Sequence, residues 1–267
     1  MRLPVTLPFL NRPPFVAVIR LQGVISASAR GALSDTALAD TIDKAFSKGK
    51  PAAVALVINS PGGSPVQSSL IAARIRRLSE EKKVPVHAFV EDVAASGGYW
   101  IACAADDIHA DPASIIGSIG VISAGFGAHE FIQRHGIERR IHTAGESKSQ
   151  MDPFKPEQPE DVARLERLLT QMHELFIDHV KRRRGSKLDD DPRVFSGEFW
   201  LADEAKDLGL IDGMSDVIPL MKARYGDKVK FRHYGARKGL LRRFGMQLAG
   251  DALAAVDERA AFARFGL

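Results

Sequence analysis

The sequence predicts an α/β fold of stacked βαβ units around a mostly parallel sheet, with a helical C-terminal extension. Three observations favour this fold. Apolar runs of strand length alternate with segments whose apolar residues recur at helical spacing. The connections between these segments are short, and one strand-length run is apolar throughout, as in a parallel strand that is covered on both faces. Strand, helix and strand in this order indicate crossover connections within one sheet.

The first elements follow from this periodicity. Residues 15–21 are rich in strand formers, and residues 34–48 carry apolar side chains at helical spacing before a Gly-Lys-Pro sequence that ends the helix. Residues 53–58 form the continuously apolar strand. A second helix is expected over 66–81, and a third strand over 84–90.

Two unusual loops follow these strands. Residues 59–64, Asn-Ser-Pro-Gly-Gly-Ser, close the second strand and open the next helix, and residues 92–98 lie just past the third strand. Sites in parallel sheets gather outside the carboxyl ends of the strands. We therefore expect the functional site at these two loops.

The second half of the chain is expected to be more helical. A glycine- and serine-rich stretch over 114–123 precedes a short helix around Ala128–His135. A long helix from Pro159 to about Arg184 carries an apolar stripe that suits the core or a subunit interface. A helix-turn-strand unit at 195–213 closes the fold. The expected organisation is an N-terminal extension over 1–14, a main domain over 15–216 and a basic amphipathic region over 217–267.

Composition excludes several classes of protein. The 267 residues carry 37 basic and 33 acidic side chains, and 45% of them are hydrophobic, so the chain can bury a substantial core. Its one cysteine, Cys103, excludes a disulfide framework within the chain and a cysteine-rich zinc site. The acidic residues around His109 alternate between strand faces, and we expect no metal. Neither a cofactor nor nucleic acid is expected as a ligand.

Proline interrupts the N-terminal residues at four positions, which excludes a spanning helix there, and no other stretch is long and apolar enough. The expected location is cytoplasmic or peripheral to a membrane.

Ser96 and Lys148 are the candidate catalytic pair. Ser96 lies in the small-residue run Ala-Ala-Ser-Gly-Gly, and Lys148 lies in Gly-Glu-Ser-Lys-Ser. A serine hydroxyl needs a base to take its proton, and a lysine amine serves only where burial or a nearby cation lowers its pKa from about 10.4 towards neutrality.

Two further requirements of acyl transfer can be assigned to glycine and serine residues. The oxyanion needs backbone N–H donors, and the N–H groups of Gly63 and Gly97 are the candidates because glycine adopts the backbone conformations that direct such groups at one point. The base needs an orienting hydrogen bond, which the Ser118 hydroxyl is placed to supply.

Five motifs connect these residues to a known family: Asn59–Ser64, Ala95–Tyr99, Gly117–Val121, Gly145–Lys148 and Val194–Gly197. In these motifs and their order the chain resembles the signal peptide peptidases of the SppA type, in serine–lysine peptidase family S49. The resemblance implies a Clp/crotonase-like fold over 15–216, Ser96 as nucleophile, Lys148 as general base, Ser118 as the base-orienting hydroxyl, and Gly63 with Gly97 as oxyanion donors. It also implies an extended peptide as substrate, with apolar or small side chains. It further implies a homo-oligomer in which a neighbouring subunit supplies the lysine. Contact with a membrane surface would be peripheral.

Three alternatives stay open at this point. A Clp-type peptidase would use a histidine as base, for which His129 and His135 are the nearest later candidates. A crotonase-like acyl-CoA enzyme would use the same oxyanion donors without a nucleophile. An oligomeric scaffold with a decayed site would use none of these residues.

Overall fold

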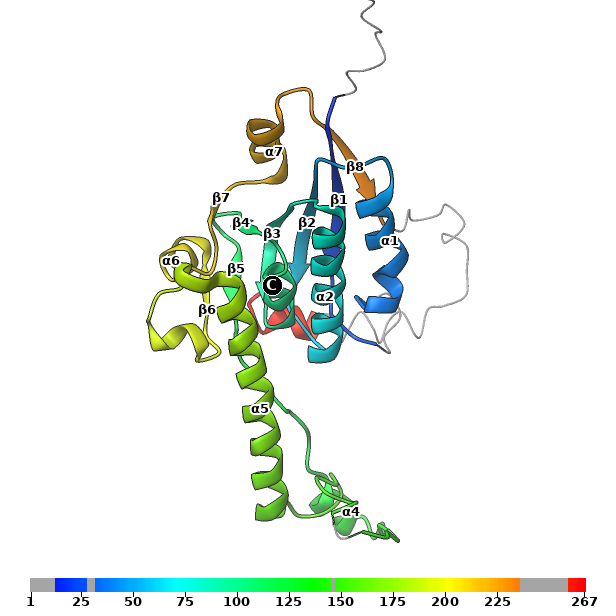
Figure 1. The fold of residues 1–267 in the computed structure, drawn as a ribbon. Coiled ribbons are helices and arrows are strands. Elements are labelled where there is room, and N and C mark those ends of the chain that lie inside the picture. Colours follow the sequence, from blue (N-terminus) through cyan, green and yellow to red (C-terminus); the bar gives the residue numbers. More distant parts are fainter. Residues whose placement is uncertain (1–12, 28–31, 146, 236–258) are drawn as a thin grey trace, which may run out of the picture.

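Eight strands form one sheet in the computed structural model, which describes residues 13–27, 32–145, 147–235 and 259–267 (Figure 1). The strands are β1 (Phe15–Gln22), β2 (Ala53–Ser60), β3 (Val86–Ala95), β4 (Asp107–Ala110), β5 (Ile115–Gly117), β6 (Phe199–Leu201), β7 (Gly213–Met214) and β8 (Lys230–Tyr234). Their main order is β6-β5-β3-β2-β1-β8, with β4 between β3 and β7. Every pair is parallel except β5 with β6, which confirms the predicted mostly parallel α/β sheet.

The helices are α1 (Asp35–Ser47), α2 (Pro65–Lys82), α3 (Gly97–Ala102), α4 (His129–Arg134), α5 (Pro159–Arg184), α6 (Ala202–Asp207) and α7 (Val217–Tyr225). α1 and α2 lie side by side on one face of the sheet (Figure 1). Serine side chains start both helices: Ser34 accepts the N–H of Ala37, and Ser64 accepts the N–H of Gln67. The predicted bounds of these two helices are therefore correct to within one residue at each end.

The central strands bury both of their faces. On β1 and β2 the residues that contact the α1 and α2 side, such as Ile19 and Leu56, alternate with residues such as Val18 and Ala55 that join a second apolar cluster on the other side. Full burial of one such aliphatic side chain stabilises the fold by about 1.5–3 kcal/mol. The continuous apolar runs thus reflect two cores, one on each face.

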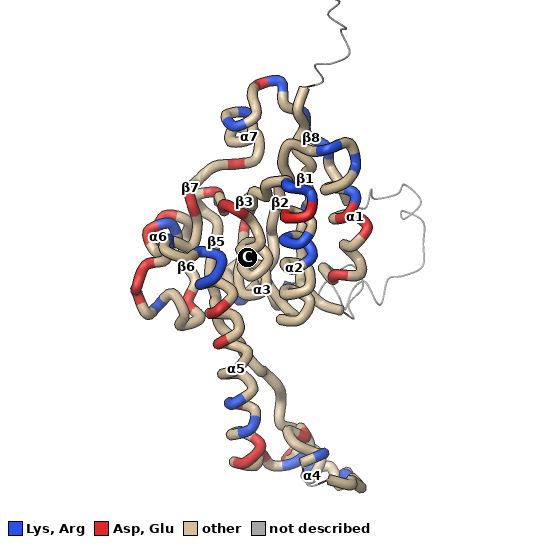
Figure 2. The backbone as a smooth tube through the Cα atoms, viewed as in Figure 1, with Lys and Arg blue, Asp and Glu red and all other residues tan. Residues whose placement is uncertain are grey.

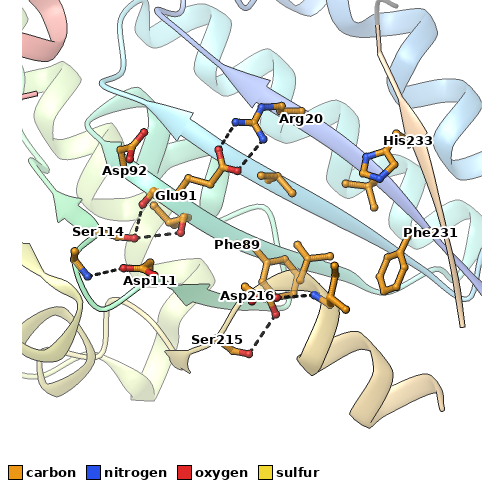
Figure 3. A pocket seen from close by; sticks show the side chains of 16 residues that line it. Arg20, Phe89, Glu91, Asp92, Asp111, Ser114, Ser215, Asp216, Phe231 and His233 are labelled. Carbon is orange, nitrogen blue, oxygen red and sulfur yellow. Dashed lines mark hydrogen bonds and ion pairs between the residues drawn. The ribbon is translucent and has the colours of Figure 1, made fainter. Parts of the chain in front are cut away.

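The second face of the sheet is only partly covered. Met221 of α7 packs on the apolar cluster around Phe89. Beside it lies a pocket of about 750 Å³ with an apolar floor and a polar rim, on which Arg20 binds Glu91 with a 2.8 Å hydrogen bond (Figure 3). Phe231 on β8 also lines this pocket.

β8 and α7 extend the fold beyond residue 216, where a separate region was expected to begin. β8 pairs with β1 in parallel from Phe15 opposite Lys230 to Ile19 opposite Tyr234. The sheet therefore continues as far as Tyr234. Residues 1–12 and 236–258 of the expected terminal regions lie outside the described residues. Within the part of the chain that is described, no helix is long and apolar enough to cross a membrane.

Residues 121–145 and 147–175, here called the arm, extend away from the sheet (Figure 1). The arm contains α4 and the first part of α5. Basic and acidic residues are interspersed along it (Figure 2). The second part of α5 returns to the sheet, where Phe176 and Val180 are buried. The apolar stripe of α5 is thus divided between the core and a projecting segment.

Candidate active site

Ser96 occupies a strained turn between β3 and α3. Its backbone has φ +52° and ψ −122°, a conformation that residues with a side chain rarely adopt. Two hydrogen bonds hold it there: the Ser96 N–H donates to the Gly117 carbonyl at 2.8 Å, and the Trp100 N–H donates to the Ser96 carbonyl at 3.0 Å. A serine on a sharp strand-to-helix turn is typical of activated serine nucleophiles.

The backbone of residues 62–63 approaches this turn so closely that only glycine fits. A Cβ on Gly62 would lie 2.8 Å from the Gly97 nitrogen, and a Cβ on Gly63 would lie 2.1 Å from the Ile25 carbonyl oxygen. Both glycines also have positive φ, +100° and +141°. These contacts explain why two consecutive glycines occupy this loop.

Gly63 and Gly97 are neighbours in space. A Cβ built on Gly97 would lie 3.4 Å from the Gly63 nitrogen. Among the described residues, neither N–H has a hydrogen-bond acceptor. Two free backbone donors beside a serine are what an oxyanion requires.

One cavity of about 430 Å³ brings most of the predicted residues together. Ser96, Gly63, Gly97 and Ser118 all line it. Ser118 follows β5, also has positive φ, and is fixed by an N–H bond of 2.6 Å to the Glu198 carbonyl. The sheet therefore places the predicted nucleophile, both predicted oxyanion donors and the predicted orienting hydroxyl around one space.

Lys148 does not line this cavity. It lies in the arm, in a segment of turns between α4 and α5, and its side chain is exposed. Within the described ranges its amine makes no hydrogen bond or ion pair; the Lys148 N–H donates to the Gly145 carbonyl at 3.2 Å. The chain therefore brings four of the five predicted site residues together, and leaves the lysine outside.

The walls of the cavity were not predicted from the sequence. Trp100, Met172 and Phe176 line it, together with Phe265 near the C-terminal end. The Trp100 and Phe176 ring centroids are 4.9 Å apart. The one signal for α5 was its apolar stripe, which indicated burial but not what the stripe would cover.

His179 fixes α5 to the serine turn. Its ring stacks on Trp100 with centroids 4.6 Å apart, and its Nε2 lies 3.0 Å from the Trp100 carbonyl oxygen. Burial lowers the pKa of His179 to about 4, against the opposing effect of that hydrogen bond. At neutral pH the ring is therefore neutral, donates to the carbonyl, and has a structural role.

Other histidines are placed away from the serine. His129 and His135 lie on or beside α4 in the arm, and none of the described residues around the cavity is a histidine. His173 instead contacts the carbonyl of Ile119 through its Nε2 at 2.9 Å. This arrangement argues against a histidine base for Ser96.

The acidic residues around His109 and the single cysteine occupy structural positions. Asp107 accepts hydrogen bonds from His87 at 3.0 Å and from Arg224 at 2.6 Å. Burial opposes its ionisation, but the bonds from His109, His87 and Arg224 outweigh burial and hold the Asp107 pKa below its usual value. Cys103 is buried, which raises the pKa of its thiol to about 12 and makes it unreactive.

A strained serine at the carboxyl end of a parallel strand, with two free backbone amides beside it, is typical of hydrolases that act by acyl transfer to serine. Comparison with known proteins identifies the family. The family model described as "Peptidase family S49" matches residues 79–224, more than half of the chain. The chain belongs to peptidase family S49, which confirms the predicted class of enzyme, a serine peptidase.

Individual relatives cover this chain almost completely. A protein named "Na(+)/H(+) antiporter NhaA" from Brucella melitensis is 49% identical over 271 residues, which are 94% of this chain and 37% of that protein. A "Probable protease SohB" from Haemophilus influenzae is 32% identical over 242 residues, which are 89% of this chain and 66% of that protein. The chain thus spans about a third of the length of the first relative and about two thirds of the second.

Two solved structures share the fold. Both are of the "1510-N membrane-bound stomatin-specific protease". A serine-to-alanine variant matches with a TM-score of 0.54 and 18% identity, over 85% of this chain and 100% of that one. A lysine-to-alanine variant in complex with a substrate peptide matches with a TM-score of 0.52 and 16% identity, over 91% and 98%. These likenesses confirm the predicted Clp/crotonase-like fold.

Proposed function

We propose that this chain is a serine endopeptidase or peptide-remnant peptidase in which Ser96 is the nucleophile and Lys148 of a neighbouring copy is the general base. The observation that carries the proposal is the cavity in which Ser96, Gly63, Gly97 and Ser118 meet. It contains a nucleophile and oxyanion donors, and it lacks a base among the described residues that line it.

The chemistry follows from these positions. The Ser96 Oγ attacks the scissile carbonyl carbon while the Lys148 Nζ takes its proton, and the N–H groups of Gly63 and Gly97 stabilise the oxyanion. The Lys148 ammonium then returns the proton to the leaving amine as the C–N bond breaks. A water molecule, deprotonated by the same amine, hydrolyses the acyl-enzyme and releases Ser96.

A lysine can act in this way only in its neutral form. Entry into the apolar cavity would remove water from the amine and favour the neutral form, and a hydrogen bond from the amine to the Ser118 Oγ would orient it. Peptidase activity is therefore expected to rise with pH as the base loses its proton, and then to reach a plateau.

Exposed apolar residues on the arm support assembly with further copies. Large hydrophobic side chains that are at least one-third exposed gather there: Ile122, Phe126, Phe131, Ile137, Met151, Phe154, Leu168, Met172 and Leu175. Phe126 is 94% exposed. Such a surface marks a protein interface. An arm that packs against a neighbour would deliver Lys148 to that neighbour's serine cavity.

The substrate class follows from the cavity walls. Trp100, Phe176 and Phe265 offer apolar contacts, and the glycine loop leaves room for a substrate backbone. We infer that the substrate is an extended peptide with apolar or small side chains. The substrate peptide bound to the structural neighbour described above supports a peptide as the substrate.

The test is the loss of peptidase activity on fluorogenic apolar peptides. Ser96→Ala and Lys148→Ala are each expected to lower kcat/KM by about a thousandfold or more, since the nucleophile and the base act together and each substitution removes one of them. Ser123→Ala and Lys155→Ala, in exposed positions of the arm, are the matched controls and should be active. A fluorophosphonate probe should label the wild-type protein and not Ser96→Ala. Full activity of Ser96→Ala would reject the proposal.

A further inference from the structure

The lining of the serine cavity includes the side chain of Arg264. Among the described residues around that space, Arg264 alone carries a charge, and no carboxylate accompanies it. The adjacent walls are apolar, from Trp100, Phe176 and Phe265. A cation at the edge of such a cavity, with no carboxylate beside it, can attract an anion from the solvent.

The chain holds the segment around Arg264 in place through the next residue, Phe265. Residues 259–263 form a helical turn, and Arg264 lies directly after it. Phe265 is buried against Val93 and Ala95 of β3, and its ring meets Phe199 edge-on with centroids 5.1 Å apart. Ala95 is the residue before Ser96. The segment that carries Arg264 is therefore packed on the strand that ends at the nucleophile.

The guanidinium of Arg264 has no hydrogen-bond or ion-pair partner among the described residues. Many arginines of the chain are paired, such as Arg184, which lies 2.7 Å from Asp212. Arg264 makes no ion pair or hydrogen bond with the described residues, and its side chain is exposed. A free guanidinium has five N–H donors in a planar fork that matches a carboxylate with two parallel hydrogen bonds.

We propose that Arg264 binds a carboxylate of the substrate and so selects apolar peptides that carry one negative group close to the scissile bond. The proposal rests on the peptidase function proposed above and specifies its substrate. The carboxylate comes either from an Asp or Glu side chain or from the free C-terminus of a short peptide. Both sources present the same planar group to the guanidinium, and the experiment separates them.

The test measures binding to Ser96→Ala, which does not turn the substrate over. A short labelled peptide of alanine and leucine is prepared with one glutamate or with one glutamine at each position in turn, and with a free or an amidated C-terminus. Fluorescence anisotropy then gives Kd for each member. At one position, the glutamate peptide should bind roughly threefold to tenfold more tightly than the matching glutamine peptide, or the peptide with a free C-terminus should bind more tightly than its amidated form by the same factor, or both.

Variants of Arg264 show whether this residue causes the preference for peptides that carry a carboxylate. In the Ser96→Ala background, Arg264→Gln should abolish the preference, Arg264→Lys should retain part of it, and Arg264→Glu should reverse it in favour of the neutral peptide. Arg259→Gln is the matched control, because Arg259 is exposed on the same helical turn and does not line the cavity. In the enzyme with Ser96 intact, Arg264→Gln should raise KM for the charged peptide with little change in kcat.

The outcomes separate this inference from the peptidase proposal. Equal binding of charged and neutral peptides at every position would overturn the role of Arg264, as would an equal effect of Arg259→Gln. The peptidase proposal is judged on other grounds, since Ser96-dependent cleavage of the neutral peptide upholds it even when no charge preference exists.

Discussion

The sheet and the arm differ in whether they bury their large apolar side chains. In the sheet, Ile19 and Leu56 are fully buried, and the Ser96 turn is fixed by backbone hydrogen bonds and by glycines that no other residue can replace. In the arm, Phe126 and Phe131 are exposed. Exposed apolar residues of this kind support the proposal that the arm is an interface.

The comparison teaches that the two halves of the proposed dyad depend on different things. The serine half lies within one chain, because its turn and its amide donors come from the sheet and α3, and its walls come from the packed helices together with Met172 at the base of the arm. The lysine half lies on an exposed surface of the arm, which a further copy covers in the proposed assembly. Variants in the sheet should therefore change stability and chemistry within each copy, whereas variants in the arm should act through assembly.

Among substitutions that compare the sheet with the arm outside the proposed dyad, the largest effect is expected from a matched pair of glycine substitutions. Gly63→Ala puts a Cβ 2.1 Å from the Ile25 carbonyl oxygen at a φ of +141°, so the loop must move and the oxyanion donors separate. We expect a loss of about a hundredfold or more in kcat. Gly125→Ala in the arm meets nothing within 4 Å and should keep full activity. Equal activity of the two variants would show that the Gly63 loop is not part of the site.

A second pair of substitutions tests whether α5 is divided between a buried part and a projecting part. Phe176→Ala removes a buried ring that packs on Trp100, and we expect it to lower the free energy of unfolding by about 3–5 kcal/mol. Leu175→Ala, one residue away but 62% exposed, should leave the stability of the isolated chain within about 0.5 kcal/mol of wild type. Denaturant unfolding under conditions that keep the chain monomeric measures both. If Leu175→Ala were as destabilising as Phe176→Ala, the arm would be part of the core.

The smallest effect concerns the pH dependence of stability. The pKa of His179 falls from an ordinary value of 6.5 to about 4 in the fold, so between these values the unfolded chain binds a proton that the folded chain does not. Stability from this residue is fully present above pH 6.5, and about 3 kcal/mol is lost as the pH falls through 4. Tm measured against pH should show a flatter acid limb for His179→Gln. His135→Gln, in the arm, should retain the wild-type profile.

The residues of the proposed serine half could be chosen from the sequence because their signals are local, and the fold brings them to one cavity. The glycines at 62, 63 and 97 and the serines at 96 and 118 lie in short motifs of small residues, which can be recognised without knowing the tertiary contacts. The fold class and most helices were predicted for the same reason, since burial sets the hydrophobic periodicity.

The strand bounds were less accurate. β3 was expected to end at Val90 but continues to Ala95, because Glu91 faces Arg20 at the pocket rim while the backbone pairs on with β5. β8 was missed because its five residues are mostly polar, as suits an edge strand that exposes one side to solvent.

The remaining features depend on tertiary contacts that no local pattern encodes. The place of Arg264 in the cavity depends on the packing of Phe265 under β3. Likewise, Ser96 and Lys148 are 52 positions apart along the chain, and this separation does not say in which copy the two meet.

The central claim is that each active site combines the sheet of one copy with the arm of another, and co-assembly of inactive variants tests it most directly. Equal amounts of Ser96→Ala and Lys148→Ala subunits, assembled together with co-assembly verified by two affinity tags, should recover about a quarter of wild-type activity, since half of the sheets and half of the arms are intact. In an equal mixture of wild type with the Ser96→Ala/Lys148→Ala double variant, about a quarter of the sites should likewise be active. No recovery in the first mixture and about half in the second would place both residues of the dyad within one chain and contradict the account.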